Sequence, residues 1–140
     1  MKKVLATMVL SAIAYVGHAQ NIVGRWKTID DETGKAKSIV EITENKGVYT
    51  GKVIEILTEK KNAVCEKCTD ERKGKPIKGM VVIKGIQKKG DEFTGGKILD
   101  PNSGKEYKCT IKPNGTNKIN VRGYVGISAL GRTQTWHKVN

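Results

Sequence analysis

Apolar positions along the chain occur in short runs that alternate with polar positions. The runs are rich in Val, Ile, Thr and aromatic residues, and turn-forming residues bound nearly all of them. This pattern is typical of β-strands, and the regular spacing of the runs favours a sandwich or a barrel. We expect eight strands, at residues 22–30, 38–44, 48–58, 79–87, 92–99, 106–112, 118–125 and 131–139.

Most segments between these runs are short and combine a Gly with an Asn or Asp, as residues 45–47 and 113–115 do. Such hairpin turns force neighbouring strands to be antiparallel, which predicts an up-and-down order. Closing the sheet on itself removes its two unpaired edges. The sequence therefore predicts an all-β fold, a closed antiparallel up-and-down barrel of about eight strands. A barrel of this size is filled by side chains or holds one small ligand.

Glycines inside the predicted strands indicate bends or close backbone approaches; they are Gly51, Gly85, Gly95, Gly96 and Gly123. The longest break, residues 59–78, is rich in Lys and Glu and contains Cys65 and Cys68. We interpret it as a surface loop stapled by a disulfide. The alternative is a lid over one mouth of the barrel.

Residues 1–19 have the pattern of a secretory signal. Lys2 and Lys3 precede an apolar stretch at residues 4–16, and Gly17-His18-Ala19 is a small-x-small cleavage site. A retained anchor helix is the alternative, and no later stretch is long and apolar enough to span a membrane. The sequence predicts one exported domain at residues 20–140, located in the bacterial periplasm or secreted.

The chain is strongly basic, with a formal net charge of +12 that falls to +10 without Lys2 and Lys3. Most of the positive charge is Lys, which usually forms a solvated surface and protects sheet edges. The alternative is that the positive surface contacts an anionic partner in the cell envelope, either lipid or polysaccharide. We expect no nucleic acid partner for an exported chain.

A Trp near the start and an Arg near the end suit a barrel whose first and last strands pair. We expect Trp26 to pack against Arg132, with Arg122 as the second choice, in a stacked contact worth about 0.5–2 kcal/mol. The alternative is that Arg122 or Arg132 binds a ligand carboxylate or phosphate inside the barrel. Trp136 lies on the same strand face as Arg132.

The three cysteines allow several pairings in an oxidising compartment. We expect a Cys65–Cys68 disulfide worth about 2 kcal/mol or less, with Cys109 as a small buried hydrophobe. A bridge from the loop to Cys109 would contribute about 4 kcal/mol. A redox C-x-x-C lacks the strand-then-helix pattern it needs. A zinc site using the three cysteines and His137 would be destroyed by oxidation.

Nothing in the sequence predicts catalysis. His137 is the only histidine after residue 19, and no serine elbow accompanies it. The carboxylates lie mostly in turns or beside Lys, so no acid–base pair stands out. We expect a protein that is not an enzyme and has no cofactor and no metal.

Several motifs in order resemble the secreted bacterial family called domain of unknown function 2147. The resemblance spans essentially the whole chain after residue 19. It is carried by Gly24-Arg25-Trp26, Cys65-Glu66-Lys67-Cys68, residues 75–79 and 96–101, residues 104–109, Val121-Arg122-Gly123-Tyr124 and residues 131–136. It implies a small exported barrel similar to the lipocalins, in which a late Arg packs over the Trp of an opening Gly-x-Trp. Lipocalins usually carry a C-terminal helix, whereas this chain ends on a predicted strand.

Two functions from different classes remain. The first is a non-catalytic binding protein that takes a small apolar or amphipathic molecule into the barrel mouth, under the loop at residues 59–78. The second is an envelope interaction protein with a solid barrel and a Lys-rich surface. For the first function, the candidate wall residues are Trp26, Tyr107, Arg122, Tyr124 and Trp136.

Overall fold

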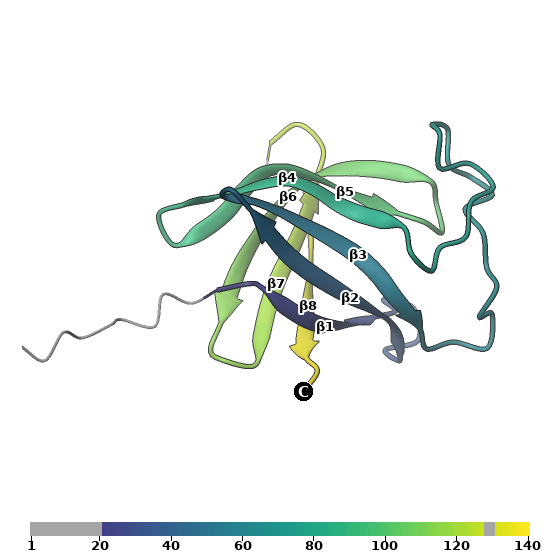
Figure 1. Ribbon diagram of the computed structural model, residues 1–140, viewed down its shortest axis with the longest axis horizontal. Coiled ribbons are helices and arrows are strands. Elements are labelled where there is room, and N and C mark those ends of the chain that lie inside the picture. Colours follow the sequence, from purple (N-terminus) through teal and green to yellow (C-terminus); the bar gives the residue numbers. More distant parts are fainter. Residues whose placement is uncertain (1–20, 128–130) are drawn as a thin grey trace, which may run out of the picture.

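The chain folds into a closed barrel of eight antiparallel strands, shown by a computed structural model (Figure 1). The structure describes residues 21–127 and 131–140, so the predicted signal segment lies outside the described residues. The strands are β1 (Gly24–Ile29), β2 (Ala36–Asn45), β3 (Val48–Ile56), β4 (Val81–Lys89), β5 (Glu92–Asp100), β6 (Lys105–Asn114), β7 (Lys118–Tyr124) and β8 (Arg132–Lys138). The predicted strand order is confirmed, with boundaries within about two residues.

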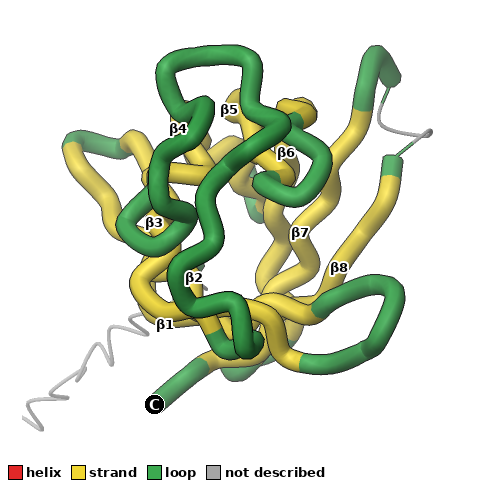
Figure 2. Tube along the Cα trace, turned by 90° about the vertical axis from the view of Figure 1, so that its right-hand side faces the viewer, coloured by secondary structure: helices red, strands yellow, loops and turns green. Residues whose placement is uncertain are grey.

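The first and last strands close the barrel. Trp26 and Lys27 of β1 pair with Lys138 and His137 of β8, and every other neighbouring pair is consecutive in sequence. The C-terminal ends of β1, β3, β5 and β7 therefore lie at one end of the barrel, together with the β1–β2, β3–β4 and β5–β6 connections, and we call it the mouth end. The β2–β3, β4–β5 and β6–β7 connections and the C-terminus lie at the opposite, closed end (Figure 1). Figure 2 looks toward the mouth end.

Large apolar side chains fill the closed end. Trp26 is 1 % exposed, and its Nε1 donates a hydrogen bond to the carbonyl of Ile22 at 2.8 Å. Tyr49 and Phe93 meet edge to face, with ring centroids 5.0 Å apart, an arrangement that aromatic pairs prefer. Isoleucines complete this packing; they include Ile42, Ile83, Ile86, Ile111 and Ile119, all fully buried.

The predicted bends at strand glycines are present. The β5–β6 register shifts between Phe93 and Gly96, and a side chain at Gly96 would collide with the main chain of β4 at Lys84. Gly51 packs against Ile83, where an added Cβ would lie 2.9 Å from the Ile83 Cβ. These close approaches let a small sheet coil tightly enough to close. In the described part of the chain no helix is long and apolar enough to span a membrane.

Candidate ligand-binding cavity

A cavity of about 960 Å³ opens at the mouth end of the barrel. Its apolar wall comes from side chains of seven strands and the β3–β4 connection; they include Val40, Val53, Ile56, Ile77, Val82, Ile98, Leu99, Tyr107, Val121 and Trp136. Sites for small molecules typically have volumes of about 300–1,000 Å³. The barrel is thus hollow at the mouth end and packed at the closed end.

The side chains of β7 show why the hollow lies where it does. Ile119, Val121 and Gly123 point to the same face of the strand, because alternate residues share a face. Ile119 is fully buried at the closed end, Val121 lines the cavity, and Gly123 lines it nearer the mouth. An added Cβ at Gly123 would lie only 3.4 Å from the Cβ of Tyr107. Inward-facing side chains therefore become smaller toward the mouth along this strand.

Several polar groups in the cavity wall already have partners. The hydroxyls of Thr28 and Ser38 share a hydrogen bond at 2.7 Å. The indole Nε1 of Trp136 donates to Oε1 of Gln134 at 2.9 Å. In the described residues no buried side-chain nitrogen or oxygen lacks a hydrogen-bond partner. The deep wall is thus suited to the apolar part of a molecule.

Charged residues line the rim. Asp30 accepts hydrogen bonds from the backbone N–H groups of Thr33 and Glu32, which lower the pKa of its carboxyl. Asp100 accepts from the backbone N–H of Asn102 and from the Ser103 hydroxyl, each at 3.0 Å. These two carboxylates hold the turns that follow β1 and β5.

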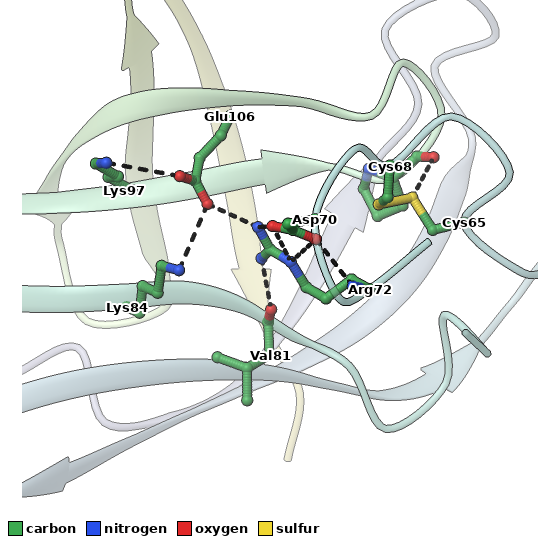
Figure 3. A network of polar contacts seen from close by, with 9 residues as sticks. Cys65, Cys68, Asp70, Arg72, Val81, Lys84, Lys97 and Glu106 are labelled. Atoms are coloured by element: carbon green, nitrogen blue, oxygen red, sulfur yellow. Dashed lines mark hydrogen bonds and ion pairs between the residues drawn. A yellow bond between two sulfur atoms is a disulfide. The ribbon is translucent and has the colours of Figure 1, made fainter. Parts of the chain in front are cut away.

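The β3–β4 connection is anchored to the barrel. The predicted Cys65–Cys68 disulfide is confirmed, with Cα atoms 5.5 Å apart. The Sγ of Cys65 lies 3.5 Å from the carbonyl of Pro101 in the β5–β6 turn (Figure 3). The same connection contributes to the cavity lining through Thr58, Glu59, Lys60, Ala63 and Ile77. It is therefore both a stapled loop and one side of the mouth.

Arg72 ties the same connection to two strands. Its Nη2 lies 2.6 Å from Oδ2 of Asp70 and 2.8 Å from Oε2 of Glu106 on β6, and its Nη1 donates to the carbonyl of Val81 on β4 at 3.2 Å (Figure 3). The hydrogen bonds from Arg72 lower the pKa of Asp70 to about 2 and also lower the pKa of Glu106. Lys84 and Lys97 lie 3.8 and 3.7 Å from the Glu106 carboxylate. Sequence reasoning missed this network because its members come from three distant segments.

Cys109 is a buried free thiol, as the sequence predicted. It is fully buried on β6, and loss of solvation raises the pKa of its thiol to about 12. The disulfide occupies Cys65 and Cys68, so the alternatives of a zinc site and of a bridge to Cys109 do not fit this structure.

Three of the five predicted wall residues line the cavity. They are Tyr107, Tyr124 and Trp136. Two predictions need correction. Trp26 is buried in the closed end and does not line the cavity. Arg122 lies on the outer face, and its Nη1 donates to Oγ1 of Thr133 at 2.8 Å.

The predicted packing of Arg132 on Trp26 is corrected as well. Trp26 pairs with Lys138, six positions along β8 from Arg132, which is roughly 20 Å of extended strand. Arg132 instead lines the cavity at the rim, and its Nη1 lies 3.1 Å from Oδ2 of Asp31. Alternation along a strand predicts the face on which a residue lies but not its position along the barrel axis. The sequence therefore did not indicate that Arg132 lies beside Asp31.

The closed antiparallel barrel, packed at one end and hollow at the other, has a lipocalin-like fold. The family model described as an uncharacterized protein conserved in bacteria, DUF2147, matches residues 24–138, and the chain belongs to this family. The fold is similar to that of protein HP1028 from the human pathogen Helicobacter pylori, which is described as belonging to the lipocalin family. The TM-score is 0.76 at 21 % identity, covering 86 % of this chain and 84 % of that chain. No curated protein sequence matches the chain significantly.

Proposed function

We propose that this protein is an exported, non-catalytic binding protein that takes a small apolar or amphipathic molecule into the mouth-end cavity. The observation that carries the proposal is the cavity of about 960 Å³ with an apolar wall and a charged rim. Apolar surface that leaves water on entering such a wall contributes roughly 25 cal/mol per Å². The charged rim is suited to the polar end of the same molecule.

The proposal of export rests on residues 1–19 and on the disulfide. The first 19 residues have the charge and apolar pattern of a signal segment. Disulfides form and persist in oxidising compartments such as the bacterial periplasm, and the Cys65–Cys68 pair is bridged. Mass measurement of the protein from a periplasmic fraction tests this. We expect a chain that begins at Gln20, and an intact Met1 in the cytoplasm would contradict export.

A substitution that fills the cavity tests the binding function. Val121→Phe adds a ring that points into the cavity, whereas Lys118→Phe places the same ring on the outer face of the same strand. We expect binding of dodecanol, measured by displacement of an apolar fluorophore, to weaken by about tenfold or more in Val121→Phe, since ring and ligand compete for one volume. Lys118→Phe should bind as the unaltered protein does. Failure of the unaltered protein to bind dodecanol and to retain any cellular lipid would contradict the proposal.

A second candidate function is contact with an anionic envelope surface. Lys84, Lys97 and Lys108 stand directly opposite one another on the outer faces of β4, β5 and β6. Like charges in such positions destabilise a sheet. Glu106 lies 3.8 and 3.7 Å from Lys84 and Lys97 and offsets part of this repulsion, and an external anionic partner would offset the rest. For this second function the sequence suggested a solid barrel, whereas the barrel is hollow at its mouth end. Binding to anionic vesicles that is unaffected by high salt would argue against it, because exposed charges are screened.

A further inference from the structure

The rim of the cavity holds an ion pair that joins the two halves of the sequence. Arg132 begins β8, and its Nη1 lies 3.1 Å from Oδ2 of Asp31 in the β1–β2 connection. It is the only arginine among the described residues that line the cavity. Its side chain is 77 % exposed, so a molecule that enters the mouth can reach the guanidinium.

Asp31 differs from the two other rim aspartates in the donor of its hydrogen bond. Asp30 and Asp100 accept backbone N–H groups and maintain their turns. Within residues 21–127 and 131–140, the Asp31 carboxylate accepts a side-chain hydrogen bond from Arg132 alone. Exposed ion pairs of this kind contribute little to stability. Another carboxylate or a phosphate can therefore replace Asp31 on Arg132 at small cost, and the planar guanidinium can bind it through two parallel hydrogen bonds.

Two further observations concern where the head group lies and which sign of charge the whole chain attracts. The charged residues that line the cavity lie in the mouth-end connections, within two residues of them or at the start of β8, so the charged end of an amphiphile stays at the rim. The chain carries a net charge of +12, or +10 without Lys2 and Lys3. A field of this sign raises the local concentration of anions and opposes cations.

We propose that the ligand is an amphiphile with a single anionic head group, and that this head group displaces Asp31 from Arg132 when it binds. Arg132 is the specificity-determining residue, and Asp31 is an internal competitor that occupies it in the empty protein. The apolar chain of the ligand lies along the wall formed by Val121, Ile98 and Trp136. This inference rests on the proposed binding function and adds the class of the ligand.

The test compares four amphiphiles with the same chain, each below its critical micelle concentration: dodecanoate, dodecyl phosphate, dodecanol and dodecyltrimethylammonium. We expect both anions to bind more tightly than dodecanol, and the cation less tightly. The tighter of the two anions distinguishes a carboxylate ligand from a phosphate ligand. Binding of the anions should weaken as the salt concentration rises, whereas binding of dodecanol should not.

Two substitutions at the pair have opposite expected effects. Arg132→Gln should weaken dodecanoate binding about two- to five-fold, and Asp31→Asn should strengthen it by a similar factor, as expected for an exposed pair. Neither should change dodecanol binding. The matched control is Arg122→Gln, which removes a guanidinium from the outer face and should leave both affinities unchanged. Thermal unfolding of each variant verifies that it is folded.

Three results would overturn the inference. In the first, Asp31→Asn weakens dodecanoate binding, so that Asp31 assists rather than competes. In the second, both variants change dodecanol and dodecanoate binding equally, so that the pair only shapes the mouth. In the third, dodecanol binds as well as the anions, and the proposed binding function then stands without this ligand class. If none of the four amphiphiles binds, the binding function fails and this inference fails with it.

Discussion

Gly104 in the β5–β6 turn packs directly against the main chain of Lys67 in the β3–β4 connection. A Cβ at Gly104 would overlap the Lys67 carbonyl, and the φ angle of Gly104 is +71°. Together with the contact of Cys65 with Pro101, this packing holds the disulfide-bearing segment against the next turn. One side of the cavity mouth therefore depends on a residue without a side chain.

Gly104→Ala should destabilise the protein by clearly more than Gly115→Ala. Gly115 has the same φ of +71° but no heavy atom within 4 Å of an added Cβ. Both variants bear the cost of a left-handed alanine, about 1–2 kcal/mol, and Gly104→Ala adds a collision with backbone. Urea unfolding at one temperature measures the two changes. Equal losses of stability would show that the turn and the β3–β4 connection are not packed together.

Arg72→Lys should lower the free energy of unfolding by about 1–2 kcal/mol, because a lysine cannot keep contacts to Asp70, Glu106 and the Val81 carbonyl at once. The matched control is Arg25→Lys. Arg25 pairs with Glu41 at 3.1 Å and has a 61 % exposed side chain, so its change should stay within about 0.5 kcal/mol. Equivalent effects of the two substitutions would argue against a structural role for the Arg72 network.

The same network predicts a sensitivity to acid. The pKa of Asp70 is lowered from 3.8 to about 2 by its hydrogen bonds with Arg72. Because the folded-state pKa is the lower one, the stabilisation is fully present above pH 3.8 and is lost as the pH falls toward 2. Urea midpoints measured across this range should fall less steeply in Asp70→Asn than in the unaltered protein. Parallel curves would contradict the assignment.

The burial of Cys109 predicts that the stability of the fold decreases as the pH rises into the alkaline range. Burial raises the pKa of its thiol from 9.0 to about 12, so the protonated thiol stabilises the fold below pH 9.0, and this contribution is lost as the pH rises toward 12. The folded protein at pH 8 should resist thiol-specific reagents, and one thiol per chain should react in urea. Cys109→Ala is the control that removes the reaction. Rapid labelling without urea would contradict its burial.

Two phenylalanine substitutions on one strand test the division of the barrel into packed and hollow ends. Ile119 is fully buried at the closed end, whereas Val121 faces the cavity. Ile119→Phe should destabilise by about 1–3 kcal/mol, since a packed core accepts no added volume. Val121→Phe should cost less than about 1 kcal/mol, because its ring enters empty space. Thermal unfolding measures both, and equal costs would mean that the cavity is not empty in solution.

The sequence by itself determined the strands, their antiparallel order and the closure of the barrel. Apolar residues at every second position select a strand and a face. Short Gly- and Asn-containing turns leave only neighbouring antiparallel partners, and an all-β chain of this length removes its edges by closing. Local chemistry also sufficed for the Cys65–Cys68 bridge, because the two cysteines are only three positions apart.

Only the tertiary structure decided where the barrel is hollow and which charges meet at its mouth. Trp26 and Arg132 both lie on strands at the seam, but the β1–β8 register sets Lys138 opposite Trp26 and leaves Arg132 beside Asp31. Arg72 meets Glu106 across 34 positions of sequence. Such contacts depend on strand stagger and on the summed volumes of side chains from several strands. The alternation of residues along one strand carries no information about either.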